Sequence, residues 1–542
     1  MTVRPSFLAR ALPLLLALGF VALAPASEPP ARVAINFPFR SPETAPTATF
    51  LHWLAELGAP AIRQFTYHDT LWEHIEPAND AFDYSGPDAV IFNTNGIRTL
   101  PTLYAILAGA RDVYGLQVPW RACTTPPPYA PDCGWFAPRD AADSRNYVTN
   151  TVTRYRAAAQ FWEIANEMNG KTSRPLGLPV SDFAEFLNLN RAWLQSVAPE
   201  ARVVLPGLLG TYGFPFGNST NWLHQLLLAG GGTGFDVANF HDYNSWWTLP
   251  RHFDMLRATL DAHGLTNTPI WVTETGISSR TNTPITPRYS TADSQAADVW
   301  RRLVLLYGKG AQLVAWHNFY STAHPPGADA FDQFGLLNEV GRKKKSWHAM
   351  KLLIRKLESF RDAQLLSLGR VTDDNLDGGE GRWVVQFTCA DGVRRWVLWS
   401  PTGESWTLSG LSSNHTYQIT HVVPASVSPD GHTATFTTST FKPVTGAHTL
   451  ALEDFPILVE PKAPNGLSLR IAPHEAGGVE LRWDAALDEA TGLETSPALA
   501  PPAWTNVPPE HLALSLAGGD VRARYLGPLL TQRFFRLRWD AP

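Results

Sequence analysis

Residues 161–170 read FWEIANEMNG, and residues 269–279 read PIWVTETGISS. Each stretch contains a short apolar, aromatic-rich run that ends near a carboxylate, Glu167 in the first and Glu274 in the second. In a parallel (β/α) barrel, side chains at the carboxyl ends of the strands converge on one face, so residues distant in sequence meet over one pocket. The two stretches therefore predict two barrel strands whose carboxylates face each other.

The sequence from Arg32 to Leu357 alternates between short β-like runs and longer amphipathic stretches, which predicts a parallel sheet with crossover helices. The eight predicted strands are Val33 to Phe37, Ala61 to Phe65, Ile97 to Leu103, Gln160 to Ala165, Arg202 to Pro206, Phe235 to His241, Pro269 to Thr273 and Gln312 to His317. Eight such repeats predict an α/β fold of the (β/α)8 TIM barrel type, over residues 27–357.

Helix boundaries can be predicted from capping residues. Ser181 can N-cap a helix whose apolar residues recur at helical spacing. A second helix is expected to stop at Gly264 through a left-handed C-cap, and a third, from Ala292 to Tyr307, to end at Gly308. The largest insertion, Ala105 to Arg139, is rich in Pro, Trp and Tyr and is expected to overhang the catalytic face.

After the barrel, helical spacing gives way to alternation. Trp383, Val385 and Phe387 alternate with their neighbours, and Asp391-Gly392 and Asp430-Gly431 are typical hairpin turns. We predict an antiparallel β-sandwich over residues 358–460. A Pro-rich linker and a small C-terminal all-β module follow over residues 461–542. Trp383, Trp396 and Trp483 lie in alternating strands and are expected in the core.

The first 26 residues have the pattern of a secretory signal peptide. Arg4 and Arg10 precede the apolar run Ala11 to Leu23, and Ala24-Pro25-Ala26 supplies small residues for cleavage. A retained N-terminal anchor is the alternative. No later stretch reaches the length of a membrane span, so we expect a secreted or periplasmic protein with no integral membrane span after signal removal.

The 542 residues carry a formal net charge of −5, so neither nucleic acid nor an anionic membrane is an implied partner. The basic run Arg342 to Lys345 is expected to be a solvated loop. Cys123 and Cys133 bracket a Pro-rich loop that a disulfide could close, which would leave Cys389 in a predicted strand. No C-x-x-C pair is present, which disfavours a thiolate zinc site.

Five predicted strands end in motifs that contain Arg63, Asn166-Glu167, His241-x-Tyr243, Glu274 and Trp316. Together these motifs resemble the clan A glycoside hydrolases, which are retaining (β/α)8 enzymes, and the predicted barrel followed by a β domain is similar to family 39 and family 5-like members. The resemblance implies that Glu167 is the acid/base and Glu274 the nucleophile. The supporting residues it implies are Arg63, which ionises the nucleophile; Asn166, which binds the sugar 2-hydroxyl; His241 and Tyr243, the His-x-Tyr pair; and Trp316, the floor of the sugar subsite.

Two further stretches resemble the clan, LWEHIEP at residues 71–77 and FGLLNEVGRKKKSWHAM at residues 334–350. Three positions depart from the common pattern. Ala165 and Met168 stand where many members have Trp and Pro, and Asp80 stands where Gly is common. These departures remove no catalytic group, but they leave the family and its sugar open.

The roles also follow from physical chemistry. A nucleophile must be ionised, and a neighbouring cation such as Arg63 lowers its pKa. An acid must be protonated, which burial and a second carboxylate favour. The separation of the two carboxylates decides between retention and inversion of configuration. Sugar faces could stack on Trp316 and on some of Trp72, Trp120, Trp135, Trp246 and Trp247.

We therefore expect a hydrolase that cleaves β-glycosidic bonds of a poly- or oligosaccharide, with no cofactor and no metal. One alternative is a non-catalytic carbohydrate-binding or adhesion protein with a relic barrel. Another is a barrel metallohydrolase, because His241 could ligate a metal. Against metal, the first strand reads AINF and lacks a His-x-His pair.

Overall fold

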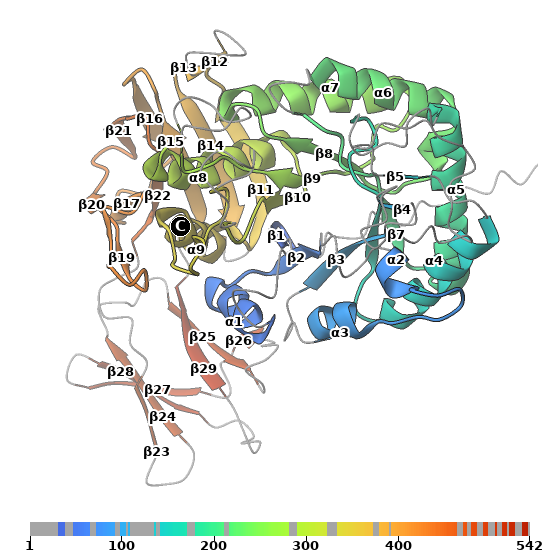
Figure 1. Ribbon diagram of the computed structural model, residues 1–542. Helices are drawn as coiled ribbons and strands as arrows, with labels where there is room; N and C mark the ends of the chain where they lie inside the picture. Colours follow the sequence, from blue (N-terminus) through green and yellow to red (C-terminus); the bar gives the residue numbers. More distant parts are fainter. Residues whose placement is uncertain are drawn as a thin grey trace, which may run out of the picture.

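The computed structural model describes residues 31–37, 47–64, 72–92, 98–103, 107–108, 135–136, 141–170, 179–210, 216–280, 290–321, 333–371, 379–389 and 392–462, and beyond these only strands within 470–539. Figure 1 shows a helix-ringed sheet with an antiparallel β domain beside it and further small sheets at the C-terminal end. The predicted signal peptide, Trp120, Cys123 and Cys133 lie outside the described residues.

Eight parallel strands form the central sheet, and all eight were predicted. They are β1 (Val33–Phe37), β2 (Ala61–Gln64), β3 (Arg98–Leu103), β6 (Phe161–Ile164), β7 (Arg202–Val204), β8 (Ala238–Asp242), β9 (Ile270–Thr275) and β10 (Leu313–Trp316). Their order is β7-β6-β3-β2-β1-β10-β9-β8. Parallel bridges Val204↔Val237 and Leu208↔Phe240 join the two outer strands, so the sheet closes on itself.

Helices pack around this sheet (Figure 1). They are α1 (Thr47–Leu57), α3 (Ser85–Ile91), α4 (Ala141–Tyr155), α5 (Val180–Val197), α6 (Phe216–Leu228), α7 (Leu249–Ala262), α8 (Ala292–Lys309) and α9 (Lys345–Leu357), with short turns α2 (Trp72–Ile75), η1 (Gly231–Thr233) and η2 (Trp246–Thr248). A small apolar cluster fills the inside of the sheet and includes Ala34, Phe161 and Trp271. The larger cluster lies between strands and helices, because alternate strand residues point to opposite faces.

Two of the three predicted helix caps are wrong. Pro179, not Ser181, occupies the N-cap of α5, and the Ser181 hydroxyl instead contacts Asp182. Helix α8 continues past Gly308 to a left-handed Gly310 with φ 102°. A Cβ at Gly308 would lie 3.3 Å from the Val385 side chain, so this glycine permits close packing rather than ending the helix. The third cap is confirmed, since Gly264 follows α7 with φ 77°.

The basic run is not the solvated loop that was expected. Lys343 is buried, and its Nζ lies 2.5 Å from Glu56 Oε1 of α1 and 5.5 Å from the centre of the Trp347 ring. Lys345 begins α9 and pairs with Asp293 at 2.6 Å. The run therefore links the start of α9 to α1 and α8 through ion pairs.

The second part of the chain is an antiparallel β domain, as predicted in outline. Six strands follow the order β11-β14-β15-β22-β17-β20. Their bounds are β11 (Phe360–Ser367), β14 (Trp383–Cys389), β15 (Arg394–Trp399), β17 (Tyr417–His421), β20 (Thr438–Phe441) and β22 (Ile457–Pro461). The pairs β12 (Arg370–Val371) with β13 (Gly379–Glu380), β16 (Ser405–Ser409) with β21 (Ala447–Ala451), and β18 (Ser426–Val427) with β19 (Ala434–Thr435) accompany them. Gly392 and Gly431 adopt the positive φ expected of the two hairpin turns.

The β domain and the helices around the closed sheet share one core. Trp383 and Trp399 belong to the same buried cluster as residues of α8, and the Trp383 ring lies 5.0 Å from that of Trp246. Arg301 of α8 lies over Trp246 and donates to Asp454 of the β domain at 2.6 Å. Trp246 and its neighbour Trp247 were candidates for sugar contact, but they are buried at this junction.

The remaining described segments are strands. A four-stranded sheet has the order β23-β24-β28-β27, and a three-stranded sheet has the order β26-β25-β29. Their bounds are β23 (Arg470–Pro473), β24 (Val479–Asp484), β25 (Thr491–Ser496), β26 (Thr505–Asn506), β27 (Leu512–Ala517), β28 (Asp520–Tyr525) and β29 (Phe534–Trp539). Within the predicted overhang, the structure describes only the pair β4 (Leu107–Ala108) and β5 (Trp135–Phe136). Among the described helices, none is long and apolar enough to cross a membrane.

The shared core can be tested by deleting its central side chain. We expect Trp383→Ala to lower the free energy of unfolding by about 3–5 kcal/mol, the usual cost of emptying a large buried aromatic site. Trp406→Ala, in the same domain but partly exposed, should cost less than half of that. Urea unfolding followed by near-ultraviolet circular dichroism measures both. A barrel transition unchanged in Trp383→Ala would show that the two parts are stabilised separately.

Candidate active site

The site is organised around a buried guanidinium. Arg63, at the end of β2, is fully buried and donates from Nε and Nη2 to both carboxylate oxygens of Glu163, at 2.7 and 2.8 Å. Its Nη1 donates to Glu274 Oε1 at 2.5 Å, and Nη2 also donates to Asn166 Oδ1 at 2.9 Å. One cation therefore connects β2, β6 and β9, and the predicted contact between Arg63 and Glu274 is present.

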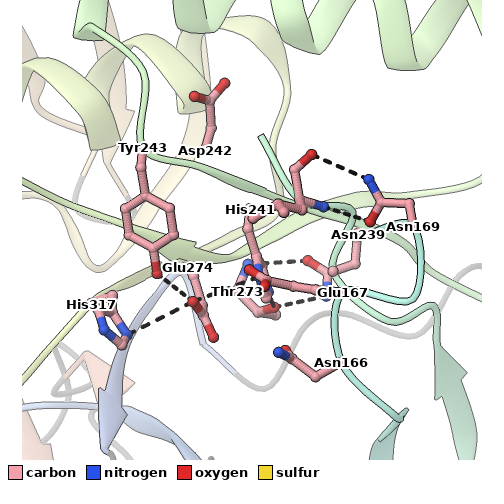
Figure 2. Close-up of polar contacts among 12 residues, drawn as sticks. Asn166, Glu167, Asn169, Asn239, His241, Asp242, Tyr243, Thr273, Glu274 and His317 are labelled. Atoms are coloured by element: carbon pink, nitrogen blue, oxygen red, sulfur yellow. Dashed lines mark hydrogen bonds and ion pairs between the residues drawn. The ribbon is translucent and has the colours of Figure 1, made fainter. Parts of the chain in front are cut away.

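Glu274 is held on both oxygens. The Tyr243 hydroxyl donates to its Oε2, and His317 Nδ1 lies 3.8 Å from the same oxygen (Figure 2). With Arg63 on Oε1, a cation, a phenol and an imidazole surround this carboxylate. Only 4% of the residue is exposed, so water screens these interactions little.

Glu167 is held by a different chain of contacts. His241 Nδ1 lies 2.8 Å from Glu167 Oε1, and His241 Nε2 lies 3.0 Å from the Thr273 hydroxyl. Asn239 Nδ2 donates to that hydroxyl at 2.7 Å, and Asn239 Oδ1 accepts from the Thr273 backbone N–H. This network fixes the imidazole so that its Nδ1 faces Glu167.

A bulge in β9 directs Glu274 into the pocket. Residues two apart in a strand share a face, so Trp271 and Thr273 both point to the barrel interior, and Glu274 would otherwise point outward. The pairing of β8 with β9 shifts here, from Phe240↔Val272 to His241↔Glu274, which leaves Thr273 as the extra residue. A bulge of this kind re-aims the following side chain, so both Thr273 and Glu274 reach the site.

A backbone turn with positive φ angles positions Glu167 in the site. Ala165 has φ 62° and Glu167 has φ 47°, conformations that non-glycine residues rarely adopt. Asn166 between them directs its amide to Arg63, and the Gly170 N–H donates to the Glu167 carbonyl at 2.7 Å. Strained backbone of this kind concentrates at functional sites.

Three further residues singled out in the sequence, Asp80, Trp72 and Trp316, have defined environments. Asp80, which stands where Gly is common, has φ 59°, the region where glycine is favoured. Trp72 is buried and donates to Glu76. Trp316 lies in the buried cluster with no exposed surface, and its Nε1 donates to the Phe334 carbonyl at 3.3 Å. Its role as a sugar platform therefore stays a prediction that requires the ring to become accessible.

Four residues of the site were not predicted from the sequence, Glu163, Asn239, Thr273 and His317. Glu163 lies two residues after Phe161, which points into the barrel, and Asn239 lies two before His241. The period of two in the strands could have found both. Thr273 follows the same period from Trp271, whereas the bulge that turns Glu274 to the same face has no clear signal in the sequence.

The two carboxylates have opposite electrostatic environments. Burial raises the pKa of Glu167, and the neighbouring Glu274 charge adds to this, although His241 and Arg63 oppose it. Burial also acts to raise the pKa of Glu274, but His241, Arg63, His317 and the Tyr243 hydroxyl outweigh it and hold that pKa below its ordinary value. Glu274 is thus the group suited to stay ionised, and Glu167 the group suited to carry a proton.

A metal could in principle be held by the same residues. Glu167, His241 and Glu274 each offer a ligand atom, and these atoms lie within 4.8 Å of one another. However, Arg63 already contacts Glu274, and a divalent cation there would be repelled by the guanidinium. The donor set therefore fits proton transfer and nucleophilic attack better than metal binding.

Comparison with known proteins agrees with this chemistry. Residues 189–329 match a family model described as glycosyl hydrolase catalytic core, a stretch that contains His241, Tyr243, Glu274 and Trp316. By this core the protein is a glycoside hydrolase, as predicted. No curated protein matches the sequence.

Solved structures share the fold at low sequence identity. A family 39 glycoside hydrolase from Bacteroides cellulosilyticus is 18% identical, with a TM-score of 0.57 and coverage of 80% of this chain and 81% of that one. A family 39 β-xylosidase from Caulobacter crescentus is 17% identical (TM-score 0.52; 81% and 98% covered). An α-L-arabinofuranosidase from Thermotoga maritima is 11% identical (TM-score 0.51; 81% and 98% covered). The fold is thus shared with clan A glycoside hydrolases, including family 39 enzymes, in agreement with the predicted resemblance.

Close backbone approach at Gly207 gives a test of the site geometry. A Cβ there would lie 1.9 Å from His241 Nε2, so Gly207→Ala must displace the imidazole from Glu167. We expect a loss of about 100-fold in kcat/KM on an aryl glycoside, since small misplacements of catalytic groups have effects of this size.

Gly217→Ala is the matched control, because its Cβ would meet only the Met255 methyl, at 3.9 Å. Steady-state hydrolysis of both variants measures the effect. Wild-type activity in Gly207→Ala would contradict the assigned role of His241.

Proposed function

We propose that the protein is a retaining glycoside hydrolase that cleaves β-glycosidic bonds of a poly- or oligosaccharide by double displacement. The observation that carries this proposal is the pairing of Glu167 with Glu274. Their nearest ligand oxygens lie within 4.8 Å of each other, and their pKa values are shifted in opposite directions. Retaining enzymes place the two carboxyl groups about 5–5.5 Å apart, and inverting enzymes about 6.5–9.5 Å apart.

In the first step, Glu274 Oε attacks the anomeric carbon while Glu167 donates its proton to the leaving oxygen. The glycosidic C–O bond breaks, and a glycosyl ester forms on Glu274. Glu167, now ionised, then removes a proton from water, which attacks the same carbon and releases the sugar with its original configuration. In both steps Glu274 lies on the face of the sugar opposite to Glu167, the leaving group and the attacking water.

The surrounding groups support this cycle. Arg63 and Tyr243 stabilise the Glu274 carboxylate before attack and after release of the sugar. When the ester forms, the negative charge beside Glu167 disappears, and one of the causes that raise the Glu167 pKa is removed. Glu167 is then better suited to act as the base of the second step.

This proposal treats the closed eight-stranded sheet as a (β/α)8 barrel and residues 358–460 as a β-sandwich attached to it. It also includes a secreted or periplasmic location, which rests on the pattern of residues 1–26. Because similar folds include a β-xylosidase and an α-L-arabinofuranosidase, pentosides belong in the first substrate panel. The carbohydrate-binding alternative would not require two carboxylates with opposite pKa shifts.

The first test compares variants on a panel of aryl β-glycosides and plant or algal β-glycans. We expect Glu274→Ala and Glu167→Ala each to lower kcat by about 10⁴-fold or more, the range for loss of a central catalytic group. Azide should restore turnover in both, giving an inverted glycosyl azide with Glu274→Ala and a retained one with Glu167→Ala.

Glu200→Ala is the control, since this exposed carboxylate lies outside the site. Anomeric products are identified by nuclear magnetic resonance. Binding without turnover in the wild type would instead favour the carbohydrate-binding alternative.

The pKa shifts predict a bell-shaped pH profile of kcat/KM. Glu274 must be ionised, and its pKa is lowered, so activity should fall only when the pH drops below the ordinary glutamate range. Glu167 must be protonated, and its pKa is raised, so activity should fall as the pH rises through a value above that range. Glu167→Gln should abolish the upper limb and leave the lower one. An upper limb that survives in this variant would assign the acid to another residue.

A further inference from the structure

The side chain of Asn36 has no hydrogen-bond partner for either of its amide atoms. Asn36 is the fourth residue of β1 and is fully buried, yet neither its Oδ1 nor its Nδ2 is bonded within the described part of the chain. Buried amides are nearly always paired with protein or ordered water, because an unpaired one loses its hydration without replacement. An unpaired buried amide on a strand of the candidate active site therefore suits hydrogen bonding to a ligand.

The strand register places this amide beside the catalytic residues. Ala34 of β1 belongs to the apolar cluster inside the barrel, and Asn36, two residues further on, shares that face. It is the last inward-facing residue before the carboxyl end of β1, where barrel enzymes bind substrate.

Its neighbours on both sides contact the nucleophile. Asn36 pairs in register with Arg63 of β2, which donates to Glu274. On the other side, β1 pairs with β10 through Ile35↔Trp316, so Asn36 lies level with His317, whose Nδ1 is 3.8 Å from Glu274 Oε2. The unpaired amide therefore lies between two residues that surround the attacking carboxylate.

Asn36 and Asn166 lie on opposite sides of Arg63 in the strand order. Asn166, after β6, bonds to the guanidinium, and β1 lies beyond β2 on the far side. A sugar whose 2-hydroxyl faces Asn166 would direct a different hydroxyl to Asn36.

We propose that Asn36 is a further substrate-binding residue, whose amide forms a hydrogen bond with a hydroxyl, other than the 2-hydroxyl, of the sugar attacked by Glu274. This inference rests on the proposed glycosidase function and deepens it. An amide offers both donors and an acceptor, so it can recognise a hydroxyl in either role. Because the amide has no protein partner, an analogue that lacks this hydroxyl leaves it unpaired and is bound less well.

The test measures kcat/KM of wild type and Asn36→Leu on an aryl glycoside and on its monodeoxy analogues. We expect Asn36→Leu to lower kcat/KM by about 10- to 100-fold on the parent sugar and on the 2-deoxy analogue, the size of one buried hydrogen bond. On one other deoxy analogue, wild type and variant should differ by less than about 3-fold, because the partner hydroxyl is already missing.

Asn190→Leu is the matched control, because Asn190 is also buried with an unpaired Oδ1 but lies on α5, away from the site. It should leave kcat/KM unchanged on every substrate. Thermal unfolding of Asn36→Leu should show no loss of stability, since leucine removes an unpaired polar group.

Equal losses on all analogues would mean that Asn36 holds a structural water or a neighbouring side chain, and would overturn the proposal. Unchanged kcat/KM in Asn36→Leu would overturn it as well. In both of these cases the wild type still turns over the sugar, so the proposed function would stand. Absence of wild-type turnover on every sugar would overturn the proposed function and this inference with it.

Discussion

The rest of the site depends on the buried Arg63 guanidinium. A cation without exposed surface is costly unless it is paired and hydrogen-bonded, and Arg63 is paired with Glu163 and Glu274 and bonded to Asn166. Glu163 takes the bidentate position, so Glu274, the proposed nucleophile, shares the guanidinium with it. This sharing keeps the pKa of Glu274 low, as the proposed nucleophilic role requires. It also ties three strands together at the pocket floor, so ion pairing and strand packing support each other.

Two irregularities of the backbone position the carboxylates of Glu167 and Glu274 in the site. Regular alternation along β9 would turn Glu274 outward, and the bulge at Thr273 turns it inward. After β6, positive φ angles at Ala165 and Glu167 bend the chain so that Asn166 reaches Arg63 while Glu167 reaches His241. The closed sheet supplies a regular frame, and these local departures from regularity bring the two carboxylates into the site. Helix α8 packs between this sheet and the β domain, so the shared core stabilises the sheet from its outer side.

Much of this could be predicted from the sequence, because strands leave a short-range signal. All eight strands of the closed sheet and the β domain follow from local patterns, and the contact of Arg63 with Glu274 is the one that the resemblance to clan A implied. The errors arise where distant residues decide the outcome. Gly308 looks like a helix stop, but Val385 requires its small size, and Lys343 looks solvated, but Glu56 and Trp347 bury it. The bulge and the unpaired Asn36 amide likewise appear only when the strands are assembled.

The proposed mechanism depends on a covalent bond between Glu274 and the sugar. Incubation with an activated 2-deoxy-2-fluoro glycoside, which slows both steps but the second most, should trap this ester, and mass spectrometry of the digested protein would locate it. We expect one added sugar per chain, on the peptide that contains Glu274, and none in Glu274→Ala. A label on Glu167 or Glu163, or hydrolysis that releases the inverted anomer without any label, would contradict it.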